Sequence, residues 1–276
     1  MSKFKVAGVQ MDIKLADAEA NLASVEKLCR VAASQGAQLV VFPECTLTGY
    51  CFDSLAEANE VAQPMDGANV QAVIEVAKRN NTHIVIGMLE SGDDGAVYNS
   101  AALVNGEGVV GVYRKTHLPF LGVDRFTTPG ARADQIFNVG DLHVGINICY
   151  DCSFPESARV LALAGADIVV LPTNWPPGSG RVSDLVPNTR ALENNVYFMS
   201  VNRIGTERGF DFIGRSKICD PVGGDLQFAN HTDEAILYAE IDADWARKKH
   251  LVAVPGQHEV HRFKDRRPDI YGPVVE

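Results

Sequence analysis

The sequence lacks the features that mark nucleic-acid-binding and membrane proteins. The chain has 276 residues and a formal net charge of −10 at pH 7, so it has no basic excess. Nucleic acids and anionic membrane surfaces both require a basic footprint. No stretch approaches the roughly 20 apolar residues of a membrane-spanning helix. We therefore expect a protein that binds neither nucleic acid nor membrane.

The chain also has little cysteine and no secretory signature. Its first residues, MSKFKVAGVQMDIK, contain a short apolar run that soon meets Asp12 and Lys14. No longer apolar region follows, as a signal peptide would need. The six cysteines are scattered along the chain: Cys29, Cys45, Cys51, Cys149, Cys152 and Cys219. This pattern favours free thiols in a reducing cytoplasm over a disulfide framework.

Repeats, low-complexity segments and clear linkers are missing as well. A chain of this length can build one large domain with a substantial core. Apolar residues make up 46% of the sequence and charged residues 22%, as is ordinary for a globular protein. We therefore expect residues 1–276 to form a single domain. The polar and basic segment 244–276 is expected to pack at an oligomer interface.

Strand-like and helix-like patterns alternate along most of the chain. Residues 38–42, QLVVF, are typical of a strand buried on both faces. Residues 18–35 have one apolar face and predict a helix with Asp17 as its N-cap. Residues 98–105 and 108–114 predict a hairpin. The alternation predicts an α/β protein in which helices cover central sheets, and three weaker strands near 214–241 predict an antiparallel finish.

Cys149 lies where a strand-like segment gives way to a helix-like one. A mostly apolar run, residues 144–148, ends on it, and a helix-like segment begins at Pro155. A helix N-terminus presents unpaired N–H groups and the positive end of its dipole, which favours a thiolate of low pKa. We therefore expect Cys149 to be a catalytic nucleophile.

Glu44 and Lys115 occupy the same type of position as Cys149, at or just past the end of a strand-like run. Sites assemble at such strand ends in layered α/β folds. Glu44 could take the thiol proton, and Lys115 could stabilise the thiolate and then the oxyanion. The backbone N–H of Tyr150 is a candidate second oxyanion donor. Attack on an amide would give a thioester, which water activated by Glu44 would hydrolyse.

Other interpretations of these residues exist. Singly, a cysteine can be a core residue, and a glutamate or lysine after a strand can face solvent. Cys149 and Cys152 also form a CxxC pair, which can mark a redox or zinc site. A redox pair would open a helix, and zinc would need a second ligand pair that Cys45 and Cys51 do not supply at comparable spacing. A non-catalytic scaffold subunit is a further alternative.

Five segments around these residues carry motifs: LVVFPECTLTGY (39–50), VGVYRKTHLP (110–119), INICYDCSFPESARVLALAGADIVVLPTNW (146–175), RALENNVYFMSVNR (190–203) and FIGRSKICDPVG (212–223). In this order they resemble the nitrilase superfamily of carbon–nitrogen hydrolases. The resemblance implies a four-layer α-β-β-α sandwich and a catalytic triad of Glu44, Lys115 and Cys149 with a thioester intermediate. It also implies a homodimer or higher homo-oligomer, and no metal or organic cofactor.

One position departs from the family pattern. Many members carry a second glutamate between the lysine and the cysteine, and no Glu occurs between Lys115 and Cys149. Asp124 sits where that glutamate would be expected, with a side chain shorter by a methylene group. It is either the second acid of the site or a loop residue paired with Arg125.

The residues after the nucleophile bear on the substrate. Nitrile-cleaving members typically carry Trp-Glu there, whereas this chain has Tyr150-Asp151, as in the amidase and carbamoyl-hydrolase branches. By analogy Tyr50, Asn174 and Trp175 would line the substrate pocket. We therefore expect hydrolysis of a small amide to a carboxylic acid and ammonia. Hydrolysis of N-carbamoyl amines or amino acids, or of nitriles, is the alternative.

Overall fold

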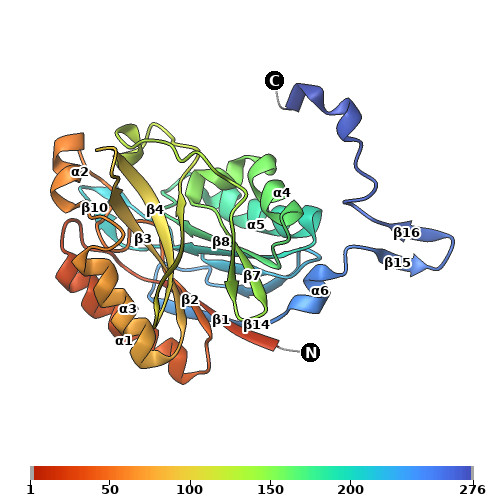
Figure 1. Ribbon diagram of the computed structural model, residues 1–276, viewed down its shortest axis with the longest axis horizontal. Coiled ribbons are helices and arrows are strands. Elements are labelled where there is room, and N and C mark those ends of the chain that lie inside the picture. The colour runs from red at the N-terminus through yellow and green to blue at the C-terminus, as the bar shows by residue number, and fades with distance from the viewer. Residues whose placement is uncertain (1–2, 275–276) are drawn as a thin grey trace.

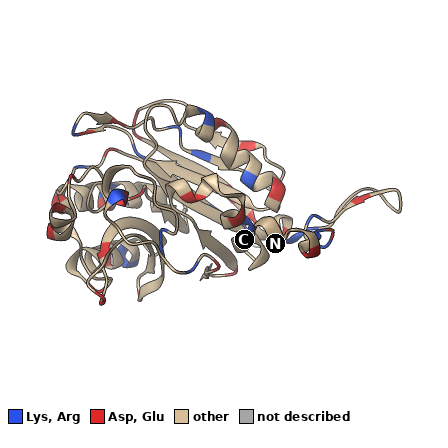
Figure 2. Ribbon diagram, turned by 90° about the horizontal axis from the view of Figure 1, so that it is seen from above, with Lys and Arg blue, Asp and Glu red and all other residues tan. Residues whose placement is uncertain are grey.

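The computed structural model describes residues 3–274, which form two stacked six-stranded sheets with helices on their outer faces (Figure 1). Both layers of helices carry acidic and basic residues on the outside (Figure 2). The four-layer α-β-β-α sandwich implied by the sequence is thereby confirmed. Within residues 3–274, none of the helices combines the length and the apolar character needed to cross a membrane.

The first sheet contains the hairpin that the sequence predicted. In spatial order its strands are β14 (Ala235–Asp242), β1 (Lys3–Gln10), β2 (Leu39–Val41), β3 (His83–Ser91), β4 (Val97–Asn105) and β5 (Gly108–Arg114). β1, β2 and β3 are parallel, and β4 and β5 form the antiparallel hairpin. Its outer face is covered by α1 (Ala18–Ser34) and α3 (Ala68–Asn80). α1 begins at its predicted N-cap, because the Asp17 side chain accepts the Ala20 N–H at 3.0 Å.

The second sheet carries α4 (Pro155–Leu163) and α5 (Gly180–Asn194) on its outer face. Its strands in spatial order are β13 (Asp225–Phe228), β12 (Lys217–Cys219), β9 (Tyr197–Asn202), β8 (Ile168–Thr173), β7 (Leu142–Ile146) and β6 (Ile136–Val139). The expected antiparallel finish is only partly formed here. β12 and β13 pair in this sheet, whereas β14 crosses to the first sheet and pairs with β1.

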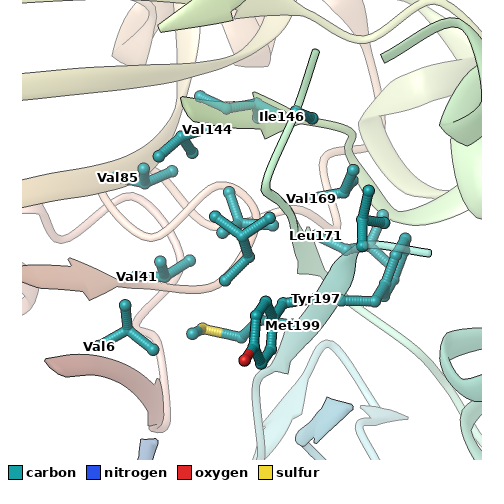
Figure 3. Packing of buried hydrophobic residues seen from close by; sticks show 14 of the residues in the cluster. Val6, Val41, Val85, Val144, Ile146, Val169, Leu171, Tyr197 and Met199 are labelled. Carbon is teal, nitrogen blue, oxygen red and sulfur yellow. The ribbon is translucent and has the colours of Figure 1, made fainter. Parts of the chain in front are cut away.

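The core between the sheets is built from alternating residues of their strands. Val6, Val41 and Val85 of the first sheet face Ile146 and Met199 of the second (Figure 3). Successive side chains of a strand point to opposite faces, so the intervening residues of the first sheet pack against α1 and α3. This packing fixes the two sheets relative to each other. It therefore also fixes the loops that follow β2, β5, β7 and β8.

The chain leaves the sandwich after β14. α6 (Ala243–Arg247) is followed by residues 248–274, which extend away from the body (Figure 1). This tail contains the hairpin of β15 (Leu251–Val254) and β16 (His258–Val260). The remaining short elements are α2 (Leu55–Val61), β10 (Thr206–Glu207), β11 (Phe210–Asp211) and the 3₁₀ turns η1 (Gly122–Arg125), η2 (Cys149–Ser153), η3 (Pro268–Ile270) and η4 (Gly272–Val274).

Candidate active site

Three of the side chains singled out in the sequence lie together where the C-terminal ends of β2, β5 and β7 meet. Glu44 and Lys115, which follow β2 and β5, are 0% exposed, and Cys149, which follows β7, is 7% exposed. The Lys115 ammonium donates a hydrogen bond to Glu44 Oε1 at 2.7 Å. Both charges act on the Cys149 thiol. The geometry thus unites a thiol, an acid and a cation in one buried cluster.

Asp124 lies beside the lysine. The Lys115 ammonium donates to Asp124 Oδ2 at 2.5 Å, and the Tyr50 hydroxyl donates to the same oxygen at 2.7 Å. Arg125 does not pair with this carboxylate and donates instead to two backbone carbonyls. Asp124 is therefore paired with Lys115, and the alternative of an Asp124–Arg125 pair is not formed.

Asn99 joins the two acids and was missed in the sequence. It lies on β4, fully buried, and its side-chain amide donates to Glu44 Oε1 at 2.7 Å and to Asp124 Oδ1 at 2.9 Å. Its backbone carbonyl accepts the N–H of Lys115 at 2.8 Å. The only signal in the sequence was a polar residue inside the apolar run of a strand. Asn99 is uncharged and belongs to no motif of regular spacing, so this signal does not identify it.

The turn that carries Glu44 rests directly on β3. The Leu47 N–H donates to the Gly87 carbonyl at 3.1 Å, and Cys45 adopts a left-handed backbone with φ 52°. A Cβ at Gly87 would collide with the backbone of Pro43 and of Cys45. Glycine at this position is therefore what lets the turn approach the sheet and hold Glu44 over the strand ends.

Cys149 lies beyond the strand that was expected to end on it. β7 ends at Ile146, and Cys149 opens the turn η2. Its φ of 44° falls in the left-handed region, which residues with a side chain seldom adopt. α4 begins only at Pro155. In other enzymes, a strained turn after a strand holds the nucleophile and presents it to the substrate.

The expected thiolate of low pKa is wrong for this structure. Burial raises the pKa of the Cys149 thiol well above its usual value, and the Glu44 carboxylate raises it further. Lys115 and the backbone N–H of Asn174 lower it, but less strongly. The free enzyme therefore holds Cys149 as a thiol at neutral pH. A reaction in which this sulfur attacks would therefore require a base within the cluster to take its proton.

Glu44 has the properties of that base. Burial raises the pKa of Glu44, and so does Asp124, whereas Lys115 and Asn99 lower it. Its Oε2 has no hydrogen-bond partner among residues 3–274, so this oxygen is free to take a proton. Burial alone would lower the pKa of Lys115, but Asp124 and Glu44 raise it well above its usual value. Lys115 therefore stays charged.

Asp151 connects η2, the turn that carries Cys149, to β5, the strand that precedes Lys115. This buried carboxylate accepts the backbone N–H of Ile148 at 2.9 Å and the Tyr113 hydroxyl at 2.8 Å through Oδ2. Through Oδ1 it accepts the backbone N–H of His117 at 3.0 Å. Tyr113 and His117 flank Lys115 in sequence. In the sequence, Asp151 was only an indicator of substrate class. In the structure it fixes η2 of the second sheet relative to the end of β5 of the first.

The remaining predicted residues surround the thiol. Asn174 and Trp175 directly follow β8, and both are buried. The two polar atoms of the Asn174 side chain have no hydrogen-bond partner among residues 3–274. A buried amide without partners is rare in proteins and indicates a place where a ligand can pair. The Tyr150 side chain is exposed, and its backbone N–H belongs to the first turn of η2, where no partner within the turn exists.

The chain is similar to known proteins in both sequence and fold. The sequence matches the carbon–nitrogen hydrolase family over residues 5–250. It is 40% identical to a nitrilase of Pyrococcus abyssi, over 97% of this chain and 98% of that protein. It is 34% identical to an (R)-stereoselective amidase of Pseudomonas sp, over 86% and 82% of the two chains. The fold matches Saccharomyces cerevisiae Nit3, a member of branch 10 of the nitrilase superfamily, with TM-score 0.81, 27% identity and coverage of 93% and 96%.

The chain therefore belongs to the carbon–nitrogen hydrolase family, and the resemblance noted in its motifs is confirmed. It is an enzyme that hydrolyses carbon–nitrogen bonds.

Proposed function

We propose that this enzyme cleaves a small linear amide to a carboxylic acid and ammonia, with Cys149 as nucleophile, Glu44 as general base and acid, and Lys115 as oxyanion donor. The observation that carries the proposal is the buried cluster itself. Lys115 binds Glu44 through Oε1, while Oε2 of the same carboxylate has no partner and can accept a proton. A thiol, a free carboxylate oxygen and a fixed cation are the groups that thioester chemistry needs.

The first half of the reaction forms the thioester. The Cys149 proton passes to Glu44 Oε2 as the sulfur attacks the amide carbon, and negative charge develops on the amide oxygen. Lys115 donates to Glu44 and Asp124, which leaves its third N–H for that oxyanion, and the Tyr150 N–H is the second donor. Glu44 then returns the proton to the nitrogen, the carbon–nitrogen bond breaks, and ammonia leaves.

The second half regenerates the enzyme. Water gives a proton to Glu44 and attacks the thioester carbon. The carbon–sulfur bond then breaks, the carboxylic acid is released, and the sulfur recovers its proton from Glu44. The same two oxyanion donors serve both halves. Because the thiol starts and ends protonated, the cycle agrees with the raised pKa of Cys149.

The substrate is proposed to lie against Asn174, Trp175 and Tyr50. The Asn174 side chain, which has no partner among residues 3–274, can exchange hydrogen bonds with an amide group. The backbone N–H of Trp175 donates to Asn202 Oδ1 at 2.8 Å, which holds this residue in place. The Tyr50 hydroxyl is already bound to Asp124, so its ring rather than its hydroxyl would contact the acyl group. This set of contacts favours a small amide.

A substrate panel tests the proposal. Ammonia release is measured from ω-amides, aliphatic amides, N-carbamoyl amines and nitriles. Fastest release from an amide is the expected result. The nitrilase name of the Pyrococcus abyssi relative favours nitriles as a second candidate, and faster release from nitriles would select it. Release from none of the four classes would contradict hydrolysis of small substrates.

Asp124→Asn is expected to lower kcat/KM about tenfold to a hundredfold, since a hydrogen bond to a charged group contributes about 1.5–3 kcal/mol. The variant keeps the shape of the side chain but removes one of the two carboxylates that orient Lys115. The measurement is ammonia release from the best amide. Asp134→Asn is the matched control, because Asp134 is an exposed acid in the same loop region, paired with Arg132 at 3.2 Å. A wild-type rate for Asp124→Asn would show that no second acid is needed.

We also propose that the sandwich is one domain and that the tail packs on a second copy of the chain in a homodimer or larger homo-oligomer. Val252, Val254, Ile270 and Tyr271 of the tail are exposed in the single chain. Isolated two-stranded hairpins such as β15–β16 are marginally stable in water, so this one gains from a partner. Exposed apolar residues of this kind commonly mark subunit contacts.

Removal of residues 251–276 is expected to convert the oligomer into monomers. Size-exclusion chromatography with light scattering reports the mass of each form. Val109→Ser is the control, because Val109 is an exposed apolar residue on β5, at the edge of the first sheet opposite β14. A full-length chain that already runs as a monomer would refute this assembly.

A reducing cytoplasm is the proposed setting of the enzyme. All six cysteines are free, including the nucleophile. A thiol nucleophile stays active only while it is reduced, which the cytoplasm ensures. Fractionation of source cells with an antibody to the protein would test this location.

A further inference from the structure

We infer that Asn99 is a positioning residue that favours the ionised form of Glu44 and selects Oε2 as the oxygen that takes the proton. Asn99 touches neither the Cys149 thiol nor the substrate in the proposed reaction and would act through Glu44. The inference rests on the proposed role of Glu44 as the base.

The geometry is a closed ring of four buried groups. Asn99 donates through its side-chain nitrogen to Glu44 Oε1 at 2.7 Å and to Asp124 Oδ1 at 2.9 Å. Lys115 bridges the same two acids, at 2.7 Å to Glu44 and at 2.5 Å to Asp124. The ring therefore contains two carboxylates, one ammonium and one neutral amide. Each carboxylate is held from two sides.

The Asn99 amide offsets the excess negative charge of this ring. Two buried carboxylates that share one cation carry excess negative charge, and such a pair tends to bind a proton. A protonated Glu44 could not act as the base. Asn99 supplies both carboxylates with a donor and adds no charge of its own. Burial and Asp124 raise the pKa of Glu44, and the bonds from Lys115 and Asn99 act against this rise.

The orientation of the Asn99 amide is determined by its surroundings. Carboxylate oxygens only accept, so the amide nitrogen must face the two acids. The Asn99 carbonyl oxygen lies on the other side, where the Cys45 thiol donates to it at 3.5 Å. Cys45 directly follows Glu44 in the same turn. The turn that carries Glu44 thus also contacts Asn99, the residue that binds Glu44.

Asn99 also determines which oxygen of Glu44 reacts. Both Lys115 and Asn99 bind Oε1, and Oε2 has no partner among residues 3–274. Rotation of the carboxylate would break both bonds at once. Without Asn99, Glu44 is held by Lys115 alone, and its two oxygens become easier to exchange.

Asn99→Leu, which has a similar volume and removes both donors, tests the inference. We expect the acidic limb of the pH profile of kcat/KM to move to higher pH, because Glu44 then binds its proton more tightly. At pH 7 kcat/KM should fall about tenfold to a hundredfold. A second readout needs no substrate. The rate of Cys149 alkylation by iodoacetamide, followed by intact mass, should show the same displacement of its acidic limb.

Ser100→Ala is the matched control. Ser100 is the next residue on β4, is buried, and donates to another buried carboxylate, Glu90, at 2.6 Å outside the ring. Its loss removes a comparable hydrogen bond, and both pH profiles should keep their wild-type position. Cys45→Ala is a smaller change that removes the thiol donor to the side-chain carbonyl of Asn99. It should displace the acidic limb in the same direction, by less than Asn99→Leu does.

The outcomes separate this inference from the proposed function. The inference fails if Asn99→Leu folds and keeps the wild-type acidic limb, or if Ser100→Ala displaces it as far. If Asn99→Leu does not fold, an undisplaced limb in Cys45→Ala overturns the inference. A wild-type enzyme that hydrolyses no amide would contradict the proposed function instead, and the alkylation profiles would still decide the role of Asn99.

Discussion

Replacement of Cys149 by alanine is expected to abolish amide hydrolysis, with ammonia release lower by about four orders of magnitude or more. No other thiol can replace it. Cys45 directs its sulfur at Asn99, and Cys152 is buried with its carbonyl bound to the Arg190 side chain at 3.0 Å. The substitution removes only the sulfur atom of a buried residue, so the fold should survive with a small loss of stability. Turnover assays together with thermal unfolding separate the loss of chemistry from loss of structure.

Cys152→Ser is the matched control for this prediction. It changes a buried cysteine three positions away in the same turn and leaves Cys149 in place. Most of the activity should remain, because Cys149 works without a partner thiol. Equal loss of activity in the two variants would instead favour the CxxC dithiol interpretation.

Lys115→Met is expected to have the largest effect on stability as well as on rate. Lys115 is fully buried and is bound to two carboxylates that are themselves buried, Glu44 and Asp124. Removal of one partner from a buried ion pair typically costs about 3–5 kcal/mol, since the remaining charge is left uncompensated. We expect the free energy of unfolding at pH 7 to fall by about this amount. Catalysis should be lost too, because the oxyanion donor is gone and the base has taken up a proton.

The pH dependence of this stability loss has a definite sign. Without Lys115, the folded state binds a proton on Glu44 more tightly than the unfolded chain does, because burial and Asp124 raise the pKa of Glu44 and the opposing charge of Lys115 is gone. A carboxyl group with a raised pKa in the folded state contributes stability at low pH and loses it as pH rises. The deficit of Lys115→Met relative to wild type should therefore be smallest below about pH 4, the ordinary carboxyl range, and should grow toward neutral pH.

Urea unfolding of both proteins across this pH range measures the deficit. Lys217→Met is the matched control, because Lys217 is also buried but pairs with the partly exposed Asp225 at 3.3 Å outside the site. Its variant should stay active and show a smaller deficit. A deficit of Lys115→Met that does not change with pH would rule out uncompensated carboxylates as its cause.

The sequence predicted the features that depend only on a residue's position relative to its neighbours along the chain. Glu44, Lys115 and Cys149 each follow an apolar run, and the ends of the parallel strands in a sandwich converge, so their meeting could be predicted. The helix α1 and the hairpin of β4 and β5 could be predicted from local periodicity and turn residues.

Other features depend on contacts between distant segments. Asn99 acts through two acids that lie 55 and 25 positions away, and nothing local distinguishes it from a strand residue. The crossing of β14 to β1 is a pairing across more than 220 positions, which a local pattern does not contain. The raised pKa of Cys149 arises from burial under loops of both sheets, so the strand-end pattern alone led to the opposite expectation.

The proposed nucleophile and its proposed proton acceptor follow strands of different sheets, and the hydrogen bonds of Asp151 connect the two segments. Cys149 follows a strand of the second sheet, whereas Glu44 and Lys115 follow strands of the first. A partly folded chain in which the sheets have not yet stacked thus carries Cys149 as an ordinary cysteine without base or counter-ion. Hydrolysis therefore requires the sandwich to close, because only then do the thiol, the carboxylate and the ammonium lie in one cluster.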